Sequence, residues 1–386
     1  MNGPQPPRIE EISVEKIVNN AFGFGRMRNG KAVLVPFCLP GEKMRVAVVN
    51  ESKDYCLGRV EEVLEPSPDR RKPRCRHFQR CGGCDLQHGY YSCQLEIKKS
   101  IVAEFLASSG LSGVRFNVIP STAEWGYRNT AVFHSRNGVP GFYAYHSHDL
   151  VEIKECPILQ DAILEKAVSV LAAEGKGFQG ELKARKDNTE LVVTSLDREK
   201  NNTFRFGSLQ FRVWIKNFFQ INTSVIPLWL DEIRRFIEPS PSDEMLDLFS
   251  GVGIIGLTLA KEVSHVTGIE EDRASVKRAI INARLNEVDN TYFFSGGVER
   301  LISRVKKADK VLIDPPRAGV KFFDIARELV RLNPKVIVYS SCYPSAFFRD
   351  LKSIDEAGYR LDAVSLVDMF PQTKHFELLG RFVPKG

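Results

Sequence analysis

A glycine-rich loop between two apolar runs constrains the fold of this chain more than any other feature. Residues 245–249 predict a strand, and a Gly-x-Gly-x-x-Gly loop containing Gly251 and Gly253 leads from it into a helix-like stretch. Glycines there let the backbone turn sharply and approach a ligand closely. The next apolar run, 265–269, ends in Glu270, an acid placed to accept hydrogen bonds from ribose hydroxyls. This order favours a nucleotide-type site, for NAD or for S-adenosylmethionine, over a surface turn.

The chain is long enough for two or three domains. At 386 residues it exceeds the size that one hydrophobic core usually serves, and its 43% hydrophobic content is ordinary for a folded protein. From about residue 213, apolar runs alternate with helix-like stretches, which predicts an α/β fold with a parallel sheet between helices. The predicted domains are a small β-barrel at 1–68, a mixed α/β central domain at 69–211 and the sheet domain at 212–386.

Short β-type runs separated by turn residues fill the first predicted domain. The runs at 32–36 and 44–49 lie next to the turn signals Asn29-Gly30 and Pro40-Gly41. Several short strands in so brief a segment predict a small barrel. The Pro-Ser-Pro-Asp sequence at 66–69 then ends it as a linker.

The cysteines are expected to be reduced. Residues 1–11 are Pro-rich and then acidic, without a basic region followed by an apolar stretch, and no apolar run approaches membrane-spanning length. A cytoplasmic protein is therefore expected. Since the cytosol keeps thiols reduced, metal binding and catalysis are the uses to weigh for the eight cysteines.

A run of basic residues without an intervening acid lies beside the first cysteines. The net charge of +6 is mild, so the distribution of charge matters more than the total. The usual fate of such a run is a solvated loop. Its place beside the cysteines favours a patch that contacts RNA phosphates. The run consists of Arg70, Arg71, Lys72, Arg74, Arg76 and Arg80.

Two polar residues follow successive apolar strands of the sheet domain. Asp314 comes directly after the run 311–313 on a stiff Pro-Pro turn, and Cys342 follows the run 336–340. The carboxyl edge of an open α/β sheet is where its ligands bind. A lone cysteine is more often a small buried hydrophobe, but at this edge it is a candidate nucleophile.

A carboxylate lies inside a largely apolar segment near the end of the chain. Glu377 follows Phe376 and precedes Leu378-Leu379. A solvent-facing Glu on an alternating strand is the ordinary interpretation. An inward Glu would be costly without a partner or a task, and it could serve as a base.

These residues fit one reaction. Carbon 5 of uracil is a poor nucleophile, but addition of a thiolate at carbon 6 makes an enolate that can attack a sulfonium methyl group. Cys342 would supply the thiolate, and Glu377 would remove the proton from carbon 5 so that the thiol can leave. Asp314 would hold the target uracil or the cofactor. The target base must be flipped out or single-stranded, because stacking protects a paired base.

On these residues the chain resembles the RNA 5-methyluridine (uracil-C5) methyltransferase family, in its branch with an iron-sulfur cluster. The segments 39–42 and 66–70 resemble the family's TRAM domain, an OB-like RNA-binding barrel. The resemblance implies a Rossmann-like catalytic domain in which Cys342 is the nucleophile and Glu377 the general base. Its implied S-adenosylmethionine contacts are Gln220 in the sequence Asn-Phe-Phe-Gln-Ile-Asn, with Phe249, Gly251, Gly253, Glu270 and Asp314. Many relatives carry a polar Asn after Gly253, where this chain has Ile254.

The resemblance also implies a [4Fe-4S] cluster. Cys75-x5-Cys81-x2-Cys84, with Cys156 far downstream, matches the family's ligand pattern. Zinc is the alternative, because thiolates with His77 could form a tetrahedral site, and spacing alone does not exclude it. Either metal would brace the central domain and its basic loop against RNA. The other cysteines, Cys38, Cys56 and Cys93, are expected to be packing residues.

The expected substrate is RNA, with no membrane and no obligatory protein partner. Large-subunit (23S) ribosomal RNA is favoured over the T-loop of transfer RNA, since the TRAM-plus-cluster arrangement resembles the ribosomal branch. A dehydrogenase would leave Cys342, Glu377 and the cysteine group unexplained, and an amino-group methyltransferase needs no thiol. The non-enzymatic alternative is an RNA-binding iron-sulfur protein without catalysis.

Overall fold

The computed structural model divides the chain into two compact units. It describes residues 8–175, 178–195, 200–320 and 325–386, so the first seven residues of the predicted barrel domain lie outside the described part. The first unit is formed by residues 1–105, 141–157 and 370–375, and the second by 106–140, 158–369 and 376–386. Both units thus draw on the segment 69–211, and the predicted boundaries at 68 and 211 remain predictions.

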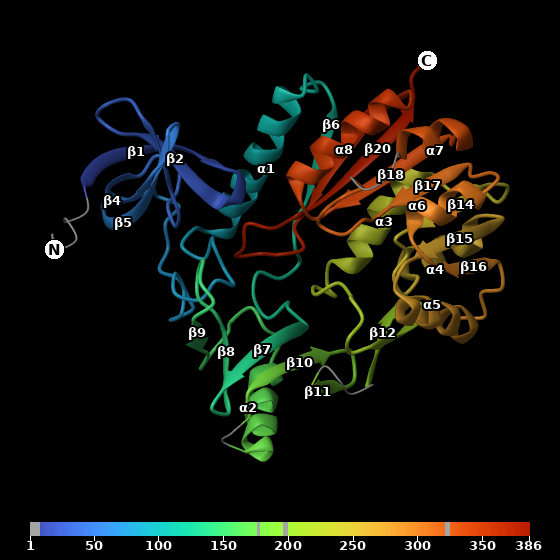
Figure 1. Cartoon of the computed structure of the whole chain (residues 1–386), viewed down its shortest axis with the longest axis horizontal. Helices are drawn as coiled ribbons and strands as arrows, with labels where there is room; N and C mark the ends of the chain where they lie inside the picture. Colours follow the sequence, from blue (N-terminus) through green and yellow to red (C-terminus); the bar gives the residue numbers. More distant parts are fainter. Residues whose placement is uncertain (1–7, 176–177, 196–199, 321–324) are drawn as a thin grey trace. The chain divides into compact units, whose positions relative to one another are not determined.

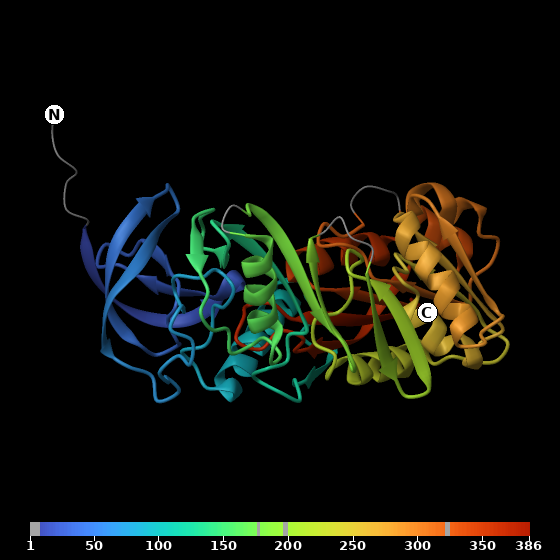
Figure 2. The same ribbon diagram turned by 90° about the horizontal axis from the view of Figure 1, so that it is seen from below.

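Five strands of the first unit close into a barrel in the order β1-β2-β3-β5-β4, blue in Figures 1 and 2. Its interior is built from alternating apolar side chains, of which Val33 and Val35 are completely buried. The predicted runs at 32–36 and 44–49 are β3 and β4, so the barrel prediction is confirmed. The strands are β1 (Ile9–Val18), β2 (Phe22–Arg26), β3 (Ala32–Val35), β4 (Lys43–Glu51) and β5 (Tyr55–Glu65).

A buried ion pair joins the two segments that resemble a TRAM domain. Glu42 has no exposed surface. Its carboxylate accepts hydrogen bonds from the backbone N–H of Leu39 at 2.8 Å and of Ser67 at 3.2 Å, and from the Arg70 guanidinium at 2.7 Å. These bonds hold the pKa of Glu42 below its usual value although burial alone would raise it. Arg70 therefore supports the barrel rather than the predicted RNA patch.

The first unit also contains the cysteine loop and most of helix α1 (Tyr91–Ser108). Strands β8 (Val139–Tyr143) and β9 (Leu150–Glu152) pair antiparallel. The backbone of Gly82 donates to Tyr143 O at 2.9 Å, and that of Tyr145 donates to Arg80 O at 2.9 Å. The hairpin and the cysteine loop are thereby held together.

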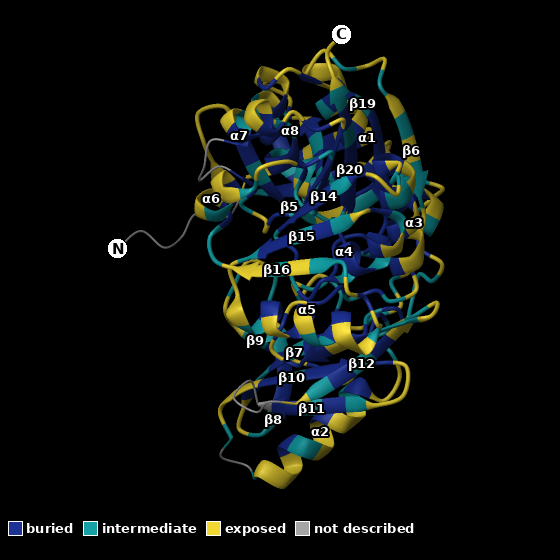
Figure 3. Cartoon of the chain, turned by 90° about the vertical axis from the view of Figure 1, so that its right-hand side faces the viewer, coloured by how far each residue is buried: buried dark blue, intermediate teal, exposed yellow. Residues whose placement is uncertain are grey.

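The second unit is built on an eight-stranded sheet in the order β16-β15-β14-β17-β18-β20-β19-β6. The first five strands are parallel, which confirms the predicted α/β sheet, and β20 runs antiparallel to both β18 and β19. The edge strand β16 is largely exposed (Figure 3). The strands are β6 (Arg115–Ile119), β14 (Glu244–Leu248), β15 (His265–Glu270), β16 (Thr291–Ser295), β17 (Lys310–Ile313), β18 (Val336–Ser341), β19 (Tyr359–Val367) and β20 (Glu377–Pro384).

Helices of the second unit pack on this sheet with one apolar face. In α3 the buried face includes Trp229, Ile233 and Phe236, all without exposed surface. Asp272 caps α5 by accepting from the N–H groups of Ala274 and Ser275. The helices are α3 (Ile226–Ile237), α4 (Ile254–Leu259), α5 (Arg273–Leu285), α6 (Val298–Leu301), α7 (Ile325–Leu332) and α8 (Pro344–Glu356).

Smaller strands complete the second unit. Strand β10 (Gly180–Lys186) pairs with β7 (Thr130–Arg136) and β11 (Leu191–Ser195), and helix α2 (Ile163–Glu174) contacts all three. Strands β12 (Asn201–Phe206) and β13 (Leu209–Trp214) form a hairpin. None of the helices in the described residues is long and apolar enough to cross a membrane.

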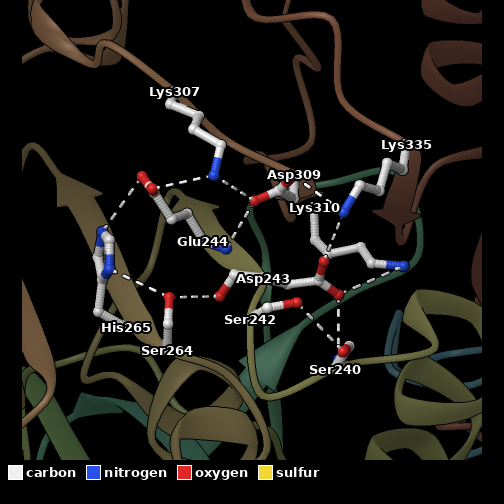
Figure 4. Close-up of polar contacts among 10 residues, drawn as sticks. All are labelled: Ser240, Ser242, Asp243, Glu244, Ser264, His265, Lys307, Asp309, Lys310 and Lys335. Carbon is white, nitrogen blue, oxygen red and sulfur yellow. Dashed lines mark hydrogen bonds and ion pairs between the residues drawn. The ribbon is translucent and has the colours of Figure 1, made fainter.

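Ionic side chains gather at the amino ends of the parallel strands, as Figure 4 shows. Asp309 pairs with Lys307 at 3.0 Å and Lys335 at 3.1 Å, and it accepts from the backbone N–H of Glu244 at 3.0 Å. Asp243 pairs with Lys335 at 3.0 Å. The network ties β14, β17 and β18 together at the edge opposite the carboxyl ends.

Candidate active site

The glycine loop follows β14 and leaves open space over its first glycine. Gly251 and Gly253 have φ values of 54° and 85°, which glycine adopts without strain. A Cβ on Gly253 would lie 3.0 Å from the Phe293 ring, whereas a Cβ on Gly251 would meet nothing within 4 Å. The backbone amides of Phe249 and Ser250 both donate to Ile269 O, at 2.8 and 3.1 Å. The loop is therefore held against β15 while remaining accessible to a ligand.

Glu270 ends β15 beside this loop, as its sequence position predicts. One carboxylate oxygen accepts from the Gly251 N–H at 3.0 Å, and the other from the Asp272 N–H at 2.8 Å. Each carboxylate oxygen has a second lone pair, so the group can still accept from ligand hydroxyls.

Buried polar atoms without a protein partner lie around the loop. Among the described residues, Asp247 Oδ1, Ser250 Oγ and Asn217 Oδ1 are buried and lack a hydrogen-bond partner. Buried polar atoms are normally satisfied, so this set fits a ligand or ordered water. Sequence reasoning assigned no role to Asp247, although a carboxyl in the middle of the run 245–249 was a signal. Burial, reinforced by the charge of Asp314, raises the pKa of Asp247 to about 8.

Gln220 is buried and held by its neighbours. The Asn129 side chain donates to Gln220 O at 3.1 Å, and the Arg185 guanidinium donates to Asn217 O at 2.7 Å. Phe219 stacks on Phe204, with ring centroids 4.4 Å apart. This segment therefore has a fixed backbone.

The three predicted reactive residues lie at one edge of the sheet, at the carboxyl ends of β17 and β18 and at the amino end of the antiparallel β20. Asp314 follows β17, Cys342 follows β18, and Glu377 is the first residue of β20. Strand pairing places Ser341 opposite Leu378, next to Glu377. The Ser340 hydroxyl donates to Glu377 Oε1 at 2.8 Å. The structure thus brings all three to one edge, and Ser340 is a member of the site that sequence reasoning missed.

Glu377 faces inward, with 3% of its surface exposed. Burial and the nearby charge of Asp314 raise its pKa well above the usual value, while the bond from Ser340 opposes the shift. Burial also raises the pKa of Asp314, to about 6. Two close carboxyl groups in such a site retain protons more strongly than in water, so either is a good proton acceptor once ionised.

The Cys342 thiol is partly buried among charged groups. Burial, and then the negative charge of Glu377, raise its pKa to about 11. Arg317 acts in the opposite sense, through its charge and a hydrogen bond to the sulfur. Arg317 belongs to the Asp-Pro-Pro-Arg turn, but sequence reasoning gave it no role.

The four predicted metal cysteines all belong to the first unit. Cys84 is buried, and the thiols of Cys81 and Cys156 act on it electrostatically. Arg76 and Glu155, which adjoin Cys75 and Cys156, are joined by a bond of 3.0 Å from the Arg76 N–H to the carboxylate. Within the described ranges, no group of three or more His, Cys, Asp or Glu side chains is arranged to hold one metal ion. The metal site therefore remains a prediction.

Two family models match this chain. The model described as tRNA (uracil-5-)-methyltransferase matches residues 159–384, and the TRAM domain model matches residues 8–60. The chain belongs to the tRNA (uracil-5-)-methyltransferase family. This confirms the predicted family and the predicted enzyme class, RNA (uracil-C5) methyltransferase.

Relatives match over almost the whole chain. An uncharacterized RNA methyltransferase from Aquifex aeolicus is 32% identical, with 96% of this chain and 97% of that protein covered. The 23S rRNA (uracil(1939)-C(5))-methyltransferase RlmD of Enterobacter sp. is 30% identical, with 96% of each protein covered.

A solved structure shares the fold. The Pyrococcus abyssi tRNA (uracil-54, C5)-methyltransferase, in complex with S-adenosyl-L-homocysteine, is 26% identical and has a TM-score of 0.76, with 96% of this chain and 99% of that chain covered. The predicted fold class is confirmed: a Rossmann-like S-adenosylmethionine methyltransferase domain follows an OB-like TRAM barrel and mixed α/β structure.

Proposed function

We propose that this methyltransferase transfers a methyl group from S-adenosylmethionine to carbon 5 of one uridine in 23S ribosomal RNA, with Cys342 as nucleophile and Glu377 as general base. The observation that carries the proposal is the convergence of Asp314, Cys342 and Glu377 at one sheet edge, in the same sheet as the glycine loop. A thiol next to a buried carboxyl is the pair of groups that this reaction requires.

In the proposed mechanism, the Cys342 thiolate adds to carbon 6 of the uracil, and the electron pair of the C5–C6 double bond moves into an enolate. Carbon 5 of the enolate then takes the methyl group of the sulfonium, and the sulfur keeps the bonding pair as S-adenosylhomocysteine. Glu377 removes the remaining proton from carbon 5. The electrons of that C–H bond re-form the double bond and expel the thiolate.

Arg317 and Ser340 have supporting roles in this scheme. Arg317 stabilises the thiolate that attacks, because a nearby cation favours the charged form of a thiol. Ser340 orients Glu377 through its bond of 2.8 Å. Asp314, which lies close to Ser340 and Glu377, is proposed to bind the uracil edge or the cofactor.

The methyl donor is proposed to lie on the glycine loop. Gly251 offers open space, and Glu270 would accept hydrogen bonds from the ribose hydroxyls. Gln220 and Phe249 would contact the rest of the S-adenosylmethionine molecule. The unpartnered oxygen of Asp247 fits the same ligand. Ile254 begins α4 directly after Gly253, so backbone amides rather than a polar side chain would contact the methionine end.

The cysteines Cys75, Cys81, Cys84 and Cys156 are proposed to hold a [4Fe-4S] cluster. Support comes from their grouping in the first unit and from the buried position of Cys84. Four thiolates are the usual ligands of such a cluster. When bound, it would supply cross-links between the cysteine loop and the segment that follows β9.

Transfer RNA is the second candidate substrate. The similarity to RlmD over nearly the whole chain favours ribosomal RNA, whereas the structural similarity to the Pyrococcus abyssi enzyme favours transfer RNA.

The test is methylation of unmodified RNA. Anaerobically purified protein is incubated with labelled S-adenosylmethionine and, in parallel, with ribosomal and transfer RNA that lack 5-methyluridine. Nuclease digestion and mass spectrometry then map the product. One methylated uridine in 23S rRNA is expected, methylation in transfer RNA alone would replace the target, and no transfer to either RNA would favour an RNA-binding protein without catalysis.

A further inference from the structure

The segment that leads to Glu377 is fastened to the cysteine loop through one glutamine. Residues 370–375 belong to the first unit, whereas Glu377, two residues later in the chain, begins β20 of the second unit. Val367 and Glu377 are paired at the end of the β19–β20 hairpin, so the residues between them form its loop. The loop therefore leads directly into the Glu377 backbone at the start of β20.

Gln372 lies at the centre of the loop and has no exposed surface. Its carbonyl oxygen accepts from the backbone N–H groups of Asp85 at 3.0 Å and Leu86 at 2.9 Å. Its own N–H donates to Gln94 Oε1 at 2.8 Å, and Gln94 Nε2 donates back to Gln372 Oε1 at 2.9 Å. Arg71 donates to the same side-chain oxygen at 3.1 Å.

The backbone of Gln372 is strained. Its φ is 69°, in the left-handed region that residues with a Cβ seldom adopt. Such a conformation persists when surrounding bonds over-determine it. Here the surrounding bonds come from helix α1 and from the two residues that follow Cys84.

Neighbouring bonds extend the attachment. The Lys374 N–H donates to Asp85 Oδ2 at 3.0 Å, and the Lys98 ammonium donates to Phe370 O at 3.1 Å. The loop is thus held on both sides of Gln372. The bond at Lys374 lies three residues before Glu377.

We propose that Gln372, clamped by Gln94 and by the amides of Asp85 and Leu86, is a positioning residue that orients Glu377 for proton removal from carbon 5. The inference rests on the proposed function, in which Glu377 acts after methyl transfer. In this proposal the cysteine loop contributes to removal of the carbon 5 proton, the step that frees the methylated RNA from Cys342, and not to the attack by Cys342. Loosening the clamp therefore slows release of the methylated RNA while leaving its methylation intact.

The test compares Gln372→Ala and Gln94→Leu with wild type in single-turnover experiments on the RNA identified as substrate. Methyl transfer to RNA is measured with labelled S-adenosylmethionine, and the fraction of protein covalently joined to RNA is measured on denaturing gels. In both variants we expect one methyl group transferred per enzyme at near the wild-type rate. In single turnover we expect accumulation of the covalent adduct, and in steady-state assays on the same RNA we expect a 10- to 100-fold lower kcat and a KM within about threefold of wild type.

Two controls make the outcome specific. Cys93→Ala alters the residue next to Gln94 in α1, whose thiol faces Gly89, and it should behave as wild type. Glu377→Gln should accumulate the adduct almost completely. A Glu377→Gln enzyme that forms no adduct would overturn the proposed function. An equal loss of adduct formation and methyl transfer in both clamp variants, with Glu377→Gln still accumulating adduct, would overturn only the role of Gln372.

Discussion

At the residue scale, the proposed nucleophile is a thiol that is hard to ionise. The pKa of Cys342 is raised to about 11 in the free protein, so a small fraction of the enzyme carries the thiolate near neutral pH. The fraction of this proposed attacking species rises about tenfold per pH unit below the pKa.

The rate of adduct formation should therefore rise with pH. Between pH 7 and pH 9 we expect the logarithm of the single-turnover rate to increase by about one per pH unit. Rapid quenching followed by denaturing gels measures this rate. A profile that is flat over the same range would show that the thiol is already ionised or that another step limits the rate.

Arg317 should determine the pH range over which the rate of adduct formation rises. Replacement by Met removes a positive charge and a hydrogen bond from the thiolate, so the thiol pKa rises further and the rate at pH 8 falls by about tenfold. Arg317→Lys keeps the charge, so its rate at pH 8 should fall less. Equal losses in the two variants would mean that Arg317 acts through its shape and not through its charge.

At the scale of elements, the ionic network at the amino ends of the strands should stabilise the sheet domain. Asp309 holds Lys307, Lys335 and the Glu244 N–H, and these bonds lower its pKa to about 2. A carboxyl with a lowered pKa in the folded state stabilises the protein above its unfolded pKa, and the contribution disappears as the pH falls toward the folded value.

Asp309→Asn should lower the free energy of unfolding by about 1–2 kcal/mol above pH 5, since both lysines are half exposed and their ion pairs are partly screened. The difference from wild type should shrink below about pH 4 and vanish near pH 2. Denaturant unfolding of both proteins across this range measures it. Asp289→Asn, at an exposed carboxylate of the same unit, is the control, and an effect equal to that of Asp309→Asn would contradict the network's role.

The sequence predicted the strands and the sheet edge of the site better than it predicted contacts between residues far apart in the chain. Apolar runs located β14, β15, β17 and β18, and the parallel α/β pattern predicted that Asp314 and Cys342 lie at the carboxyl edge of the sheet. The proposed roles of Ser340 and Arg317 rest on their contacts in the folded protein, with Glu377 and with Cys342. The sequence alone does not show which partner a serine or arginine beside a strand end will meet. The clamp on Gln372 joins residues 278 positions apart in the chain, and no local pattern encodes such a pair.

At the scale of the whole molecule, the basic run at 70–80 divides into structural and exposed residues. Arg70 pairs with buried Glu42, and Arg71 donates to Gln87 O and to Gln372, so both support the first unit. Lys72, Arg74 and Arg80 are exposed. A charge run in the sequence does not show this division, because it depends on which acceptors the fold brings near.

RNA binding should therefore depend on the exposed residues. Replacing Lys72, Arg74 and Arg80 together by Ala should weaken binding and reduce the slope of log K against log salt by about 2, at about 0.7 per lost contact with single-stranded RNA. Filter binding at several salt concentrations measures the slope. Replacement of the exposed Lys261, Lys306 and Lys352 of the second unit is the matched control, and an equal change there would mean that the effect is one of net charge.

Replacement of Cys342 by Ala removes the thiol that the proposed covalent mechanism requires. Binding of S-adenosylmethionine and methyl transfer to RNA are measured on the same preparation, beside Cys93→Ala. We expect cofactor binding within about twofold of wild type and a loss of transfer of at least about 10⁴-fold in Cys342→Ala, because the thiolate is needed to activate carbon 5. Transfer that persists within about tenfold of wild type would contradict nucleophilic catalysis by Cys342.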